Sequence, residues 1–219
     1  RARYHEPPAH EPATTPAPKA ATIPPMHWTL CKRADATARR FADRHYNRQS
    51  IGAANFAPPG RALVLREPRG FWITSWPFAE YVGHAWAGAW VCSAFRLEGG
   101  ASGDASGLIR EALAVTRWKW PTPPTIDAWQ ICRGPHSSSI ARIRVAMVTM
   151  VDPEKTTAKR DPGRCFRRAG FVEIGRTKER GLVVLGLPVD ALPLPAAPLG
   201  SQSGFDFAST PQHAPHAAR

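Results

Sequence analysis

No part of this sequence is apolar for long enough to cross a membrane, because nowhere do about 18 apolar residues follow one another. The first 22 residues carry charges and prolines where a secretory signal peptide needs an apolar stretch. The four cysteines, at positions 31, 92, 132 and 165, include no CxxC pair, which excludes the usual zinc-ribbon and thioredoxin-type patterns. The histidines lack the spacing of a metal site as well. We therefore expect reduced thiols, no metal ligands and a cytoplasmic location.

Acidic residues are the scarcer charged class. The chain has 17 Asp and Glu against 29 Lys and Arg, which gives a net charge of +12. A positive field of this size favours anionic partners, and double-stranded DNA and a phosphorylated cofactor both meet that description. Charge alone does not choose between them.

Large apolar residues are scarce at both ends of the chain. Residues 1–25 and 191–219 are rich in Pro and Ala and cannot bury enough surface to offset the entropy of ordering. We predict that both are disordered tails. Residues 26–190 have the apolar content of one core and are expected to form a single catalytic domain.

Apolar periodicity between the tails predicts helices and strands of one α/β (α+β) domain. A helix is expected over residues 35–48, with Asp35 as its N-cap, and another within residues 102–119. The short apolar or alternating segments read as strands are 62–66, 71–76, 89–96, 145–151, 171–176 and 182–187. Residues 162–169 predict a short helix closed by Gly170. Residues 121–142 lack a clean period and predict an inserted loop.

Asp152 follows the apolar strand predicted at residues 145–151. Ligands of open α/β sheets bind at the carboxyl ends of strands, so Asp152 is a candidate catalytic acid or base. The alternative is that Asp152 only caps the turn that follows, as Asp before Pro often does.

Cations are concentrated after Asp152. The candidate nucleic-acid or phosphate-binding side chains are Lys155, Lys159, Arg160, Arg164, Arg167 and Arg168. Gly163 precedes a predicted helix and could offer backbone amides to a cofactor phosphate. The alternative for such a run is an ordinary solvated face.

His45 and Tyr46 are adjacent at the end of the first predicted helix. Both residue types can transfer protons, which makes the pair a second catalytic candidate. The alternative is structural: a histidine favoured by the helix C-terminus, beside an aromatic neighbour.

Four features follow one another in a fixed order along residues 36–187. They are the helix ending in His45-Tyr46 with its glycine loop, Glu98 after a strand, the helix with Ser106 to Arg110, and the block VDP with G-x-C-F-x-x-A-G-F. Together they resemble the GNAT-fold proteins, and among them the Mom-like DNA-modification proteins of phage Mu and related phages and bacteria. Phe166 stands where GNAT-fold enzymes often carry a tyrosine. Residues 99–107 lack the basic start of the usual acetyl-CoA pyrophosphate loop.

The resemblance implies a GNAT-like, mixed and mostly antiparallel sheet flanked by helices. It also implies an acetyltransferase-like enzyme that modifies the exocyclic amine of adenine in DNA and so protects that DNA from restriction. On this interpretation His45 and Tyr46 line the base pocket, Asp152 orients or deprotonates the amine, and Arg164 and Arg167 hold phosphates. The implied donor is acetyl-CoA or another CoA thioester.

Two other functions stay open from the residues alone. One is an acyl-CoA-dependent N-acyltransferase acting on a small amine or a protein, which would use the same fold and the same Asp152. The other is a non-catalytic DNA-binding accessory protein, in which the basic stretch binds DNA and His45-Tyr46 is structural.

Overall fold

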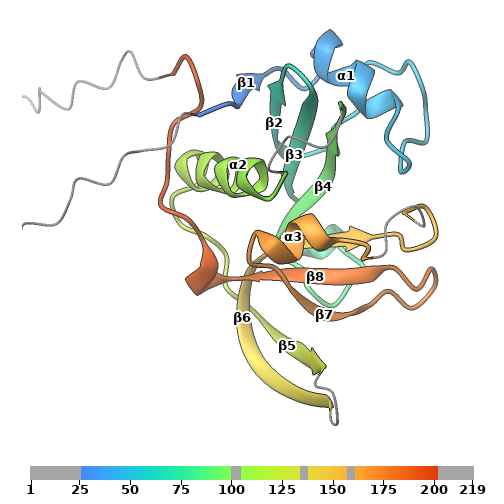
Figure 1. Cartoon of the computed structure of the whole chain (residues 1–219), viewed down its shortest axis with the longest axis vertical. Coiled ribbons are helices and arrows are strands. Elements are labelled where there is room, and N and C mark those ends of the chain that lie inside the picture. The colour runs from blue at the N-terminus through green and yellow to red at the C-terminus, as the bar shows by residue number, and fades with distance from the viewer. Residues whose placement is uncertain (1–25, 100–104, 134–137, 157–160, 202–219) are drawn as a thin grey trace, which may run out of the picture.

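The computed structural model describes residues 26–99, 105–133, 138–156 and 161–201, which form one α+β domain (Figure 1). The helices are α1 (Ala36–Asp43), α2 (Ala105–Lys119) and α3 (Arg164–Arg168), with 3-10 turns at Ala79–Tyr81 and Val189–Ala191. The strands are β1 (Thr29–Cys31), β2 (Arg61–Glu67), β3 (Gly70–Trp76), β4 (Trp90–Leu97), β5 (Ile126–Arg133), β6 (Ser138–Val151), β7 (Val172–Arg176) and β8 (Val183–Pro188). None of the helices in the described part of the chain is long and apolar enough to span a bilayer.

One sheet runs through the whole domain. Its strand order is β1-β2-β3-β4-β6-β8-β7, with β5 paired to β6 beside this path. Every pair is antiparallel except β4 and β6, which run parallel. Parallel neighbours cannot be joined by a hairpin, and the connection between β4 and β6 contains α2 and β5. The predicted mixed, mostly antiparallel sheet is confirmed.

Helix α1 begins where the sequence predicts and ends earlier. The Asp35 side chain accepts a hydrogen bond from the Ala38 amide at 2.8 Å, which satisfies one of the free amides at the helix start. Phe41 and Ala42 are buried against β2 and β3. Arg44 closes the helix, so residues 44–48, expected to be helical, form a turn instead. Helix propensity does not predict this end of the helix, because the end depends on tertiary burial, and the buried face stops at Ala42.

The main core lies between the sheet and α2. Ile109 and Leu113 of α2 are fully buried with Trp72 of β3 and Trp90 of β4. The Trp28 indole donates a hydrogen bond to the Leu108 carbonyl at 2.7 Å, which ties the start of the domain to α2. These contacts keep α2 across the sheet, close to the point where β4 and β6 run side by side.

Residues 121–142 are not the inserted loop that the sequence predicted. They contain β5 and the first part of β6, which pair in antiparallel register from Ile126 opposite Val145 to Arg133 opposite Ser138. The alternation of buried and exposed positions is weak in sequence because glutamine, cysteine and alanine occupy the inner positions of the ribbon. Tertiary contact with the neighbouring strands decides the structure of this segment.

Residues 191–201 are also ordered, contrary to the predicted C-terminal tail. The Ala196 amide donates to the Ala114 carbonyl at 3.1 Å, and the Leu199 amide donates to the Trp28 carbonyl at 2.8 Å. Prolines restrict the backbone of this segment in advance, which lowers the entropy cost of holding it with few hydrogen bonds. The predictions for residues 1–25 and 202–219 lie outside the described residues.

Candidate active-site cleft

The cleft forms where β4 separates from β6. The two strands pair only from Trp90 to Cys92 of β4, opposite Met147 to Thr149 of β6. A register shift in the pairing of β3 with β4 leaves Ser93 as an extra residue in β4, and a bulge of this kind bends a strand. Among the described strands, residues 94–97 pair with β3 alone, and the bulged Ser93 has no strand partner. A row of backbone amides and carbonyls on β4 is therefore open on the side of β6.

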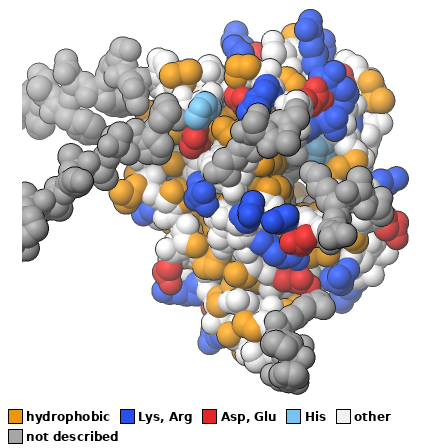
Figure 2. Space-filling model, viewed as in Figure 1, with side chains coloured by type: hydrophobic (Ala, Val, Ile, Leu, Met, Phe, Trp, Pro, Cys, Tyr) orange, Lys and Arg blue, Asp and Glu red, His pale blue; other side chains and the backbone are white. Residues whose placement is uncertain are grey.

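A cavity of about 640 Å³ occupies this opening. Its walls come from β4, the end of β6, the start of α2, α3 and the turn after α1. A second cavity of about 410 Å³ shares His45, Cys92 and Met150 with the first. Figure 2 shows Lys and Arg side chains gathered around α3, in the middle of the face viewed.

His45 lies at the mouth of the cleft because α1 ends two residues earlier. Its Nδ1 accepts a hydrogen bond from the Asn47 amide at 3.2 Å, and its ring also bonds the backbone of Phe95. Burial is the main cause that lowers the pKa of His45 from 6.5 to about 4, and the nearby Arg96 guanidinium acts in the same direction. The imidazole is neutral at pH 7. With both nitrogens engaged, His45 is better suited to positioning than to proton transfer.

Tyr46 stacks on His45, with 4.5 Å between the ring centroids and 27° between the planes. Burial is the main cause that raises the pKa of Tyr46, and a hydrogen bond with the backbone of Asp152 opposes it. The phenol therefore keeps its proton at neutral pH and lines the larger cavity. Tyr46 was predicted to be catalytic, lines the larger cavity and carries a proton that it can transfer.

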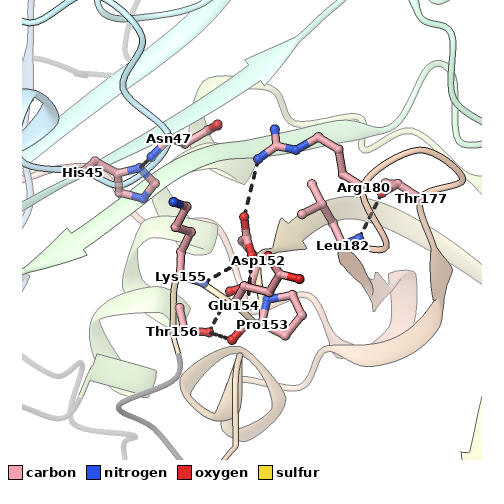
Figure 3. A network of polar contacts seen from close by, with 10 residues as sticks. All are labelled: His45, Asn47, Asp152, Pro153, Glu154, Lys155, Thr156, Thr177, Arg180 and Leu182. Atoms are coloured by element: carbon pink, nitrogen blue, oxygen red, sulfur yellow. Dashed lines mark hydrogen bonds and ion pairs between the residues drawn. The ribbon is translucent and has the colours of Figure 1, made fainter.

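Asp152 occupies the capping position that was the alternative to a catalytic role (Figure 3). Its Oδ1 accepts from the amides of Glu154 and Lys155 at 3.0 and 3.2 Å, and its Oδ2 lies 3.4 Å from the Arg180 guanidinium. The residue is 7% exposed and lines neither cavity. Through the backbone contact with Tyr46, however, Asp152 belongs to the same cluster.

The predicted cations divide into two groups. Lys155, Arg164 and Arg168 line the larger cavity, as does Gly163, which precedes α3 with a φ of +82°. Arg167 does not line it: its guanidinium bonds Asp161 at 2.6 Å, and it also pairs with a glutamate of β7.

Lys159 and Arg160 lie outside the described residues. Within the described part of the chain, no group of three or more His, Cys, Asp and Glu side chains is arranged to hold a metal ion.

Two cavity residues were missed by sequence reasoning. Cys92 is buried at the point where β4 leaves β6, and burial raises the pKa of its thiol. Arg96 bonds Glu98 at 2.8 Å and reaches the carbonyl of Arg44, which fixes the turn that carries His45. Neither residue belongs to a motif, so only the spatial arrangement reveals them. Phe166 packs against Trp72, Phe95 and Phe171 and is mainly a core residue.

No family model, curated protein or solved structure matches this chain.

The cleft combines an open strand edge, a protonated phenol and a cationic rim. Such an arrangement can hold an extended, amide-bearing ligand along β4, since a free strand edge pairs with amide groups in the manner of an added strand. It can also bind phosphates near Lys155, Arg164 and Arg168.

Proposed function

We propose that this protein is a GNAT-like transferase that modifies an exocyclic amine of adenine in DNA, using a CoA thioester as donor. The observation that carries the proposal is the cleft between β4 and β6, in which Tyr46 faces a cavity rimmed by Lys155, Arg164 and Arg168. The strand order, with one parallel pair at the cleft, supports the resemblance to the GNAT fold.

The donor fits the open edge of β4. A CoA thioester carries an extended arm with two amides, and backbone groups on the edge of residues 94–97 that faces away from β3 offer partners for them, apart from the Phe95 group that bonds His45. The start of α2 contributes Ala105 and Ser106 to the cavity wall, and amides at a helix start favour anions. Donor phosphates would lie between this helix start and the cations of α3.

Tyr46 supplies the proton transfer. As the amine nitrogen attacks the thioester carbon, the C–N bond forms and the C–S bond breaks. Tyr46 gives its phenolic proton to the leaving sulfur and recovers a proton from the amine, so the step is balanced. A phenol is protonated at neutral pH and can donate its proton when the thiolate leaves, and burial raises the pKa of Tyr46 rather than lowering it. His45 and the Asp152 backbone hold the ring in place.

DNA is the acceptor that the charge of the chain favours. A net charge of +12 attracts a polyanion more strongly than a small amine. An exocyclic amine inside a duplex is out of reach, so the base must leave the stack, and an open cavity lined by Tyr46 and Phe95 suits an extruded base. Modified adenine would protect DNA from restriction enzymes. These enzymes act in the bacterial cytoplasm, which is where we propose that this protein acts.

Nucleoside analysis tests the proposal. The chain is expressed together with a plasmid, the plasmid is digested to nucleosides, and adenine nucleosides are examined by mass spectrometry. We expect a mass-shifted adenine with the wild-type chain and with Tyr81→Phe, a control tyrosine that is 80% exposed and outside both cavities. Tyr46→Phe should reduce the product by about a hundredfold or more. Unmodified adenine with the wild-type chain would refute DNA modification.

The cleft itself favours a second candidate, the acyl-CoA-dependent N-acyltransferase on a small amine or a protein. The open edge of β4 and Tyr46 would serve the transfer of an acyl group to a small amine or a protein equally well. Saturable acetyl-CoA binding with no DNA affinity would support it. Salt-sensitive DNA binding with neither acetyl-CoA binding nor an altered nucleoside would instead indicate an accessory DNA-binding protein.

A further inference from the structure

Strands β5 and β6 form a two-stranded ribbon that projects from the body of the domain (Figure 1). Val145 of β6 is fully buried and Ile143 packs against the core, so the projecting part of β6 is the five residues before Ile143, 138–142. At about 3.3 Å per residue, this part is about 17 Å long. The cleft residues lie elsewhere, since neither cavity is lined by any residue of β5 or by the first half of β6.

The inner face of the ribbon is anchored. Ala128 and Val145 are buried in a cluster with Ile174 of β7, and Ile126 and Ile143 pack against it. These residues alternate along each strand, so they share one face. The ribbon is therefore held at its base in a defined orientation.

The outer face carries a different set of side chains. Trp129 is 60% exposed and Ile140 is 68% exposed, and register places Trp129 opposite Arg142 and Asp127 opposite Arg144. Two arginines and one aspartate thus surround an exposed apolar patch.

The Arg142 guanidinium bonds Asp127 at 2.8 Å, but both side chains are more than half exposed, so this pair contributes little stability. Arg142 can therefore exchange Asp127 for a phosphate at low cost.

We infer that the outer face of this ribbon binds a groove of double-stranded DNA, an inference that rests on the proposed DNA substrate. A two-stranded ribbon fits the major groove, which is about 12 Å wide and about 8.5 Å deep, and the projecting part is longer than that depth. Arg142 and Arg144 contact phosphates, while Trp129 and Ile140 contact the bases or sugars of the groove wall. The ribbon would hold the duplex while the cleft receives the base.

Charge favours DNA over a second copy of the chain at this face. A symmetric contact between two copies would bring the Arg142 and Arg144 pairs of both chains together, and each chain already carries a net charge of +12. A polyanion removes this repulsion instead of adding to it. Self-association is therefore an outcome of the test and not the proposal.

The first part of the test uses fluorescence anisotropy with a short labelled DNA duplex and the full chain. We expect Trp129→Ala to weaken binding about tenfold, within the range typical of losing one aromatic contact to bases. Trp129→Phe should retain most of the affinity. Tyr81→Ala, which removes another exposed aromatic side chain far from β5 in sequence, should bind like the wild-type chain. Circular dichroism and thermal midpoints establish that each variant is folded.

The second part measures the salt dependence between about 50 and 200 mM. Replacing Arg142 and Arg144 together with alanine should lower the slope of log affinity against log salt by about 2, since each lost phosphate contact contributes about 0.9. The matched pair Arg39→Ala and Arg40→Ala removes the same charge from α1 and should change the slope by less.

The outcomes separate this inference from the proposed function. If the wild-type chain binds DNA but the ribbon variants bind as tightly with the same slope, the inference is overturned, whatever the nucleoside analysis gives. If the ribbon variants lose affinity while wild-type plasmid shows no altered adenine, the inference stands and the proposed chemistry fails. A wild-type chain that does not bind duplex DNA, or a dimer that Trp129→Ala converts to a monomer, also overturns the inference.

Discussion

Acidification from pH 7.5 to pH 5 should destabilise the wild-type protein more than variants that lack the His45 imidazole. Burial holds the pKa of His45 at about 4, below the ordinary 6.5, so the unfolded chain binds a proton in this window and the folded chain does not. The neutral imidazole stabilises the fold fully above pH 6.5, and this stabilisation is lost as pH falls toward 4. The sign is therefore a loss of stability on acidification.

The magnitude follows from the two pKa values. A shift from 6.5 to about 4 corresponds to about 3 kcal/mol in full, of which about 2 kcal/mol is lost by pH 5. His45 is only partly buried, and solvent screening reduces the effect to between about 1 and 2 kcal/mol. Asp and Glu residues also begin to titrate near pH 5, but they do so in every variant.

Urea unfolding followed by tryptophan fluorescence measures this difference, since the chain has eight tryptophans. The free energy of unfolding is determined at pH 7.5, 6 and 5 for the wild-type chain, His45→Gln and His45→Phe. Both variants should lose about 1 to 2 kcal/mol less than the wild type between the extremes. Equal losses in all three proteins would refute the argument that His45 is kept neutral by burial.

Three other predictions concern the cleft and its surroundings. Gly163→Ala should lower the free energy of unfolding by about 2 to 3 kcal/mol in urea titrations, because φ is +82° and a Cβ would lie 2.8 Å from a leucine side chain of β8. The control Gly60→Ala, which has a φ of +84° and open space around the position, should lower it by about 1 kcal/mol. Equal losses in the two variants would contradict the steric argument. Iodoacetamide at pH 8 should label Cys132 well before Cys92, because Cys92 is buried and burial raises the pKa of its thiol. Peptide mass spectrometry measures the two rates, and equal rates would show that Cys92 is accessible. Arg167→Ala should lower the free energy of unfolding by about 1 kcal/mol, because the ion pairs of Arg167 with Asp161 and with a glutamate of β7 are lost. The yield of modified adenine should not change, and loss of the product would place Arg167 in substrate binding.

The predictable part of the fold follows from local rules. Asp35 caps α1 because its side chain satisfies a free amide, and Gly170 ends α3 with a φ of +105° that other residues rarely adopt. Five of the six predicted strands, such as Val183–Pro188, begin within one residue of their predicted start, whereas β6 begins at Ser138, seven residues before the predicted 145. Each of these signals acts over a few residues, which is why sequence alone reveals it.

The site was predictable only in part. His45 and Tyr46 do line the cleft, and Tyr46 contacts the backbone of Asp152, although more than 100 residues separate them. The pairing of Arg167 with Asp161 could not be separated from a phosphate-binding role by composition, since both uses need the same residue type. Cys92 gives no local sign of its place in the cavity wall.

The sequence by itself determined the charge of this protein, the class of its fold and the positions of most helices and strands, because these depend on composition and on short-range periodicity. Only the tertiary structure decided that residues 121–142 contain a β-ribbon and that residues 191–201 pack on α2 and β1. It also decided that β4 leaves β6 after Cys92 and so opens the cleft. These features depend on contacts between distant segments, and no local pattern of residues encodes such contacts.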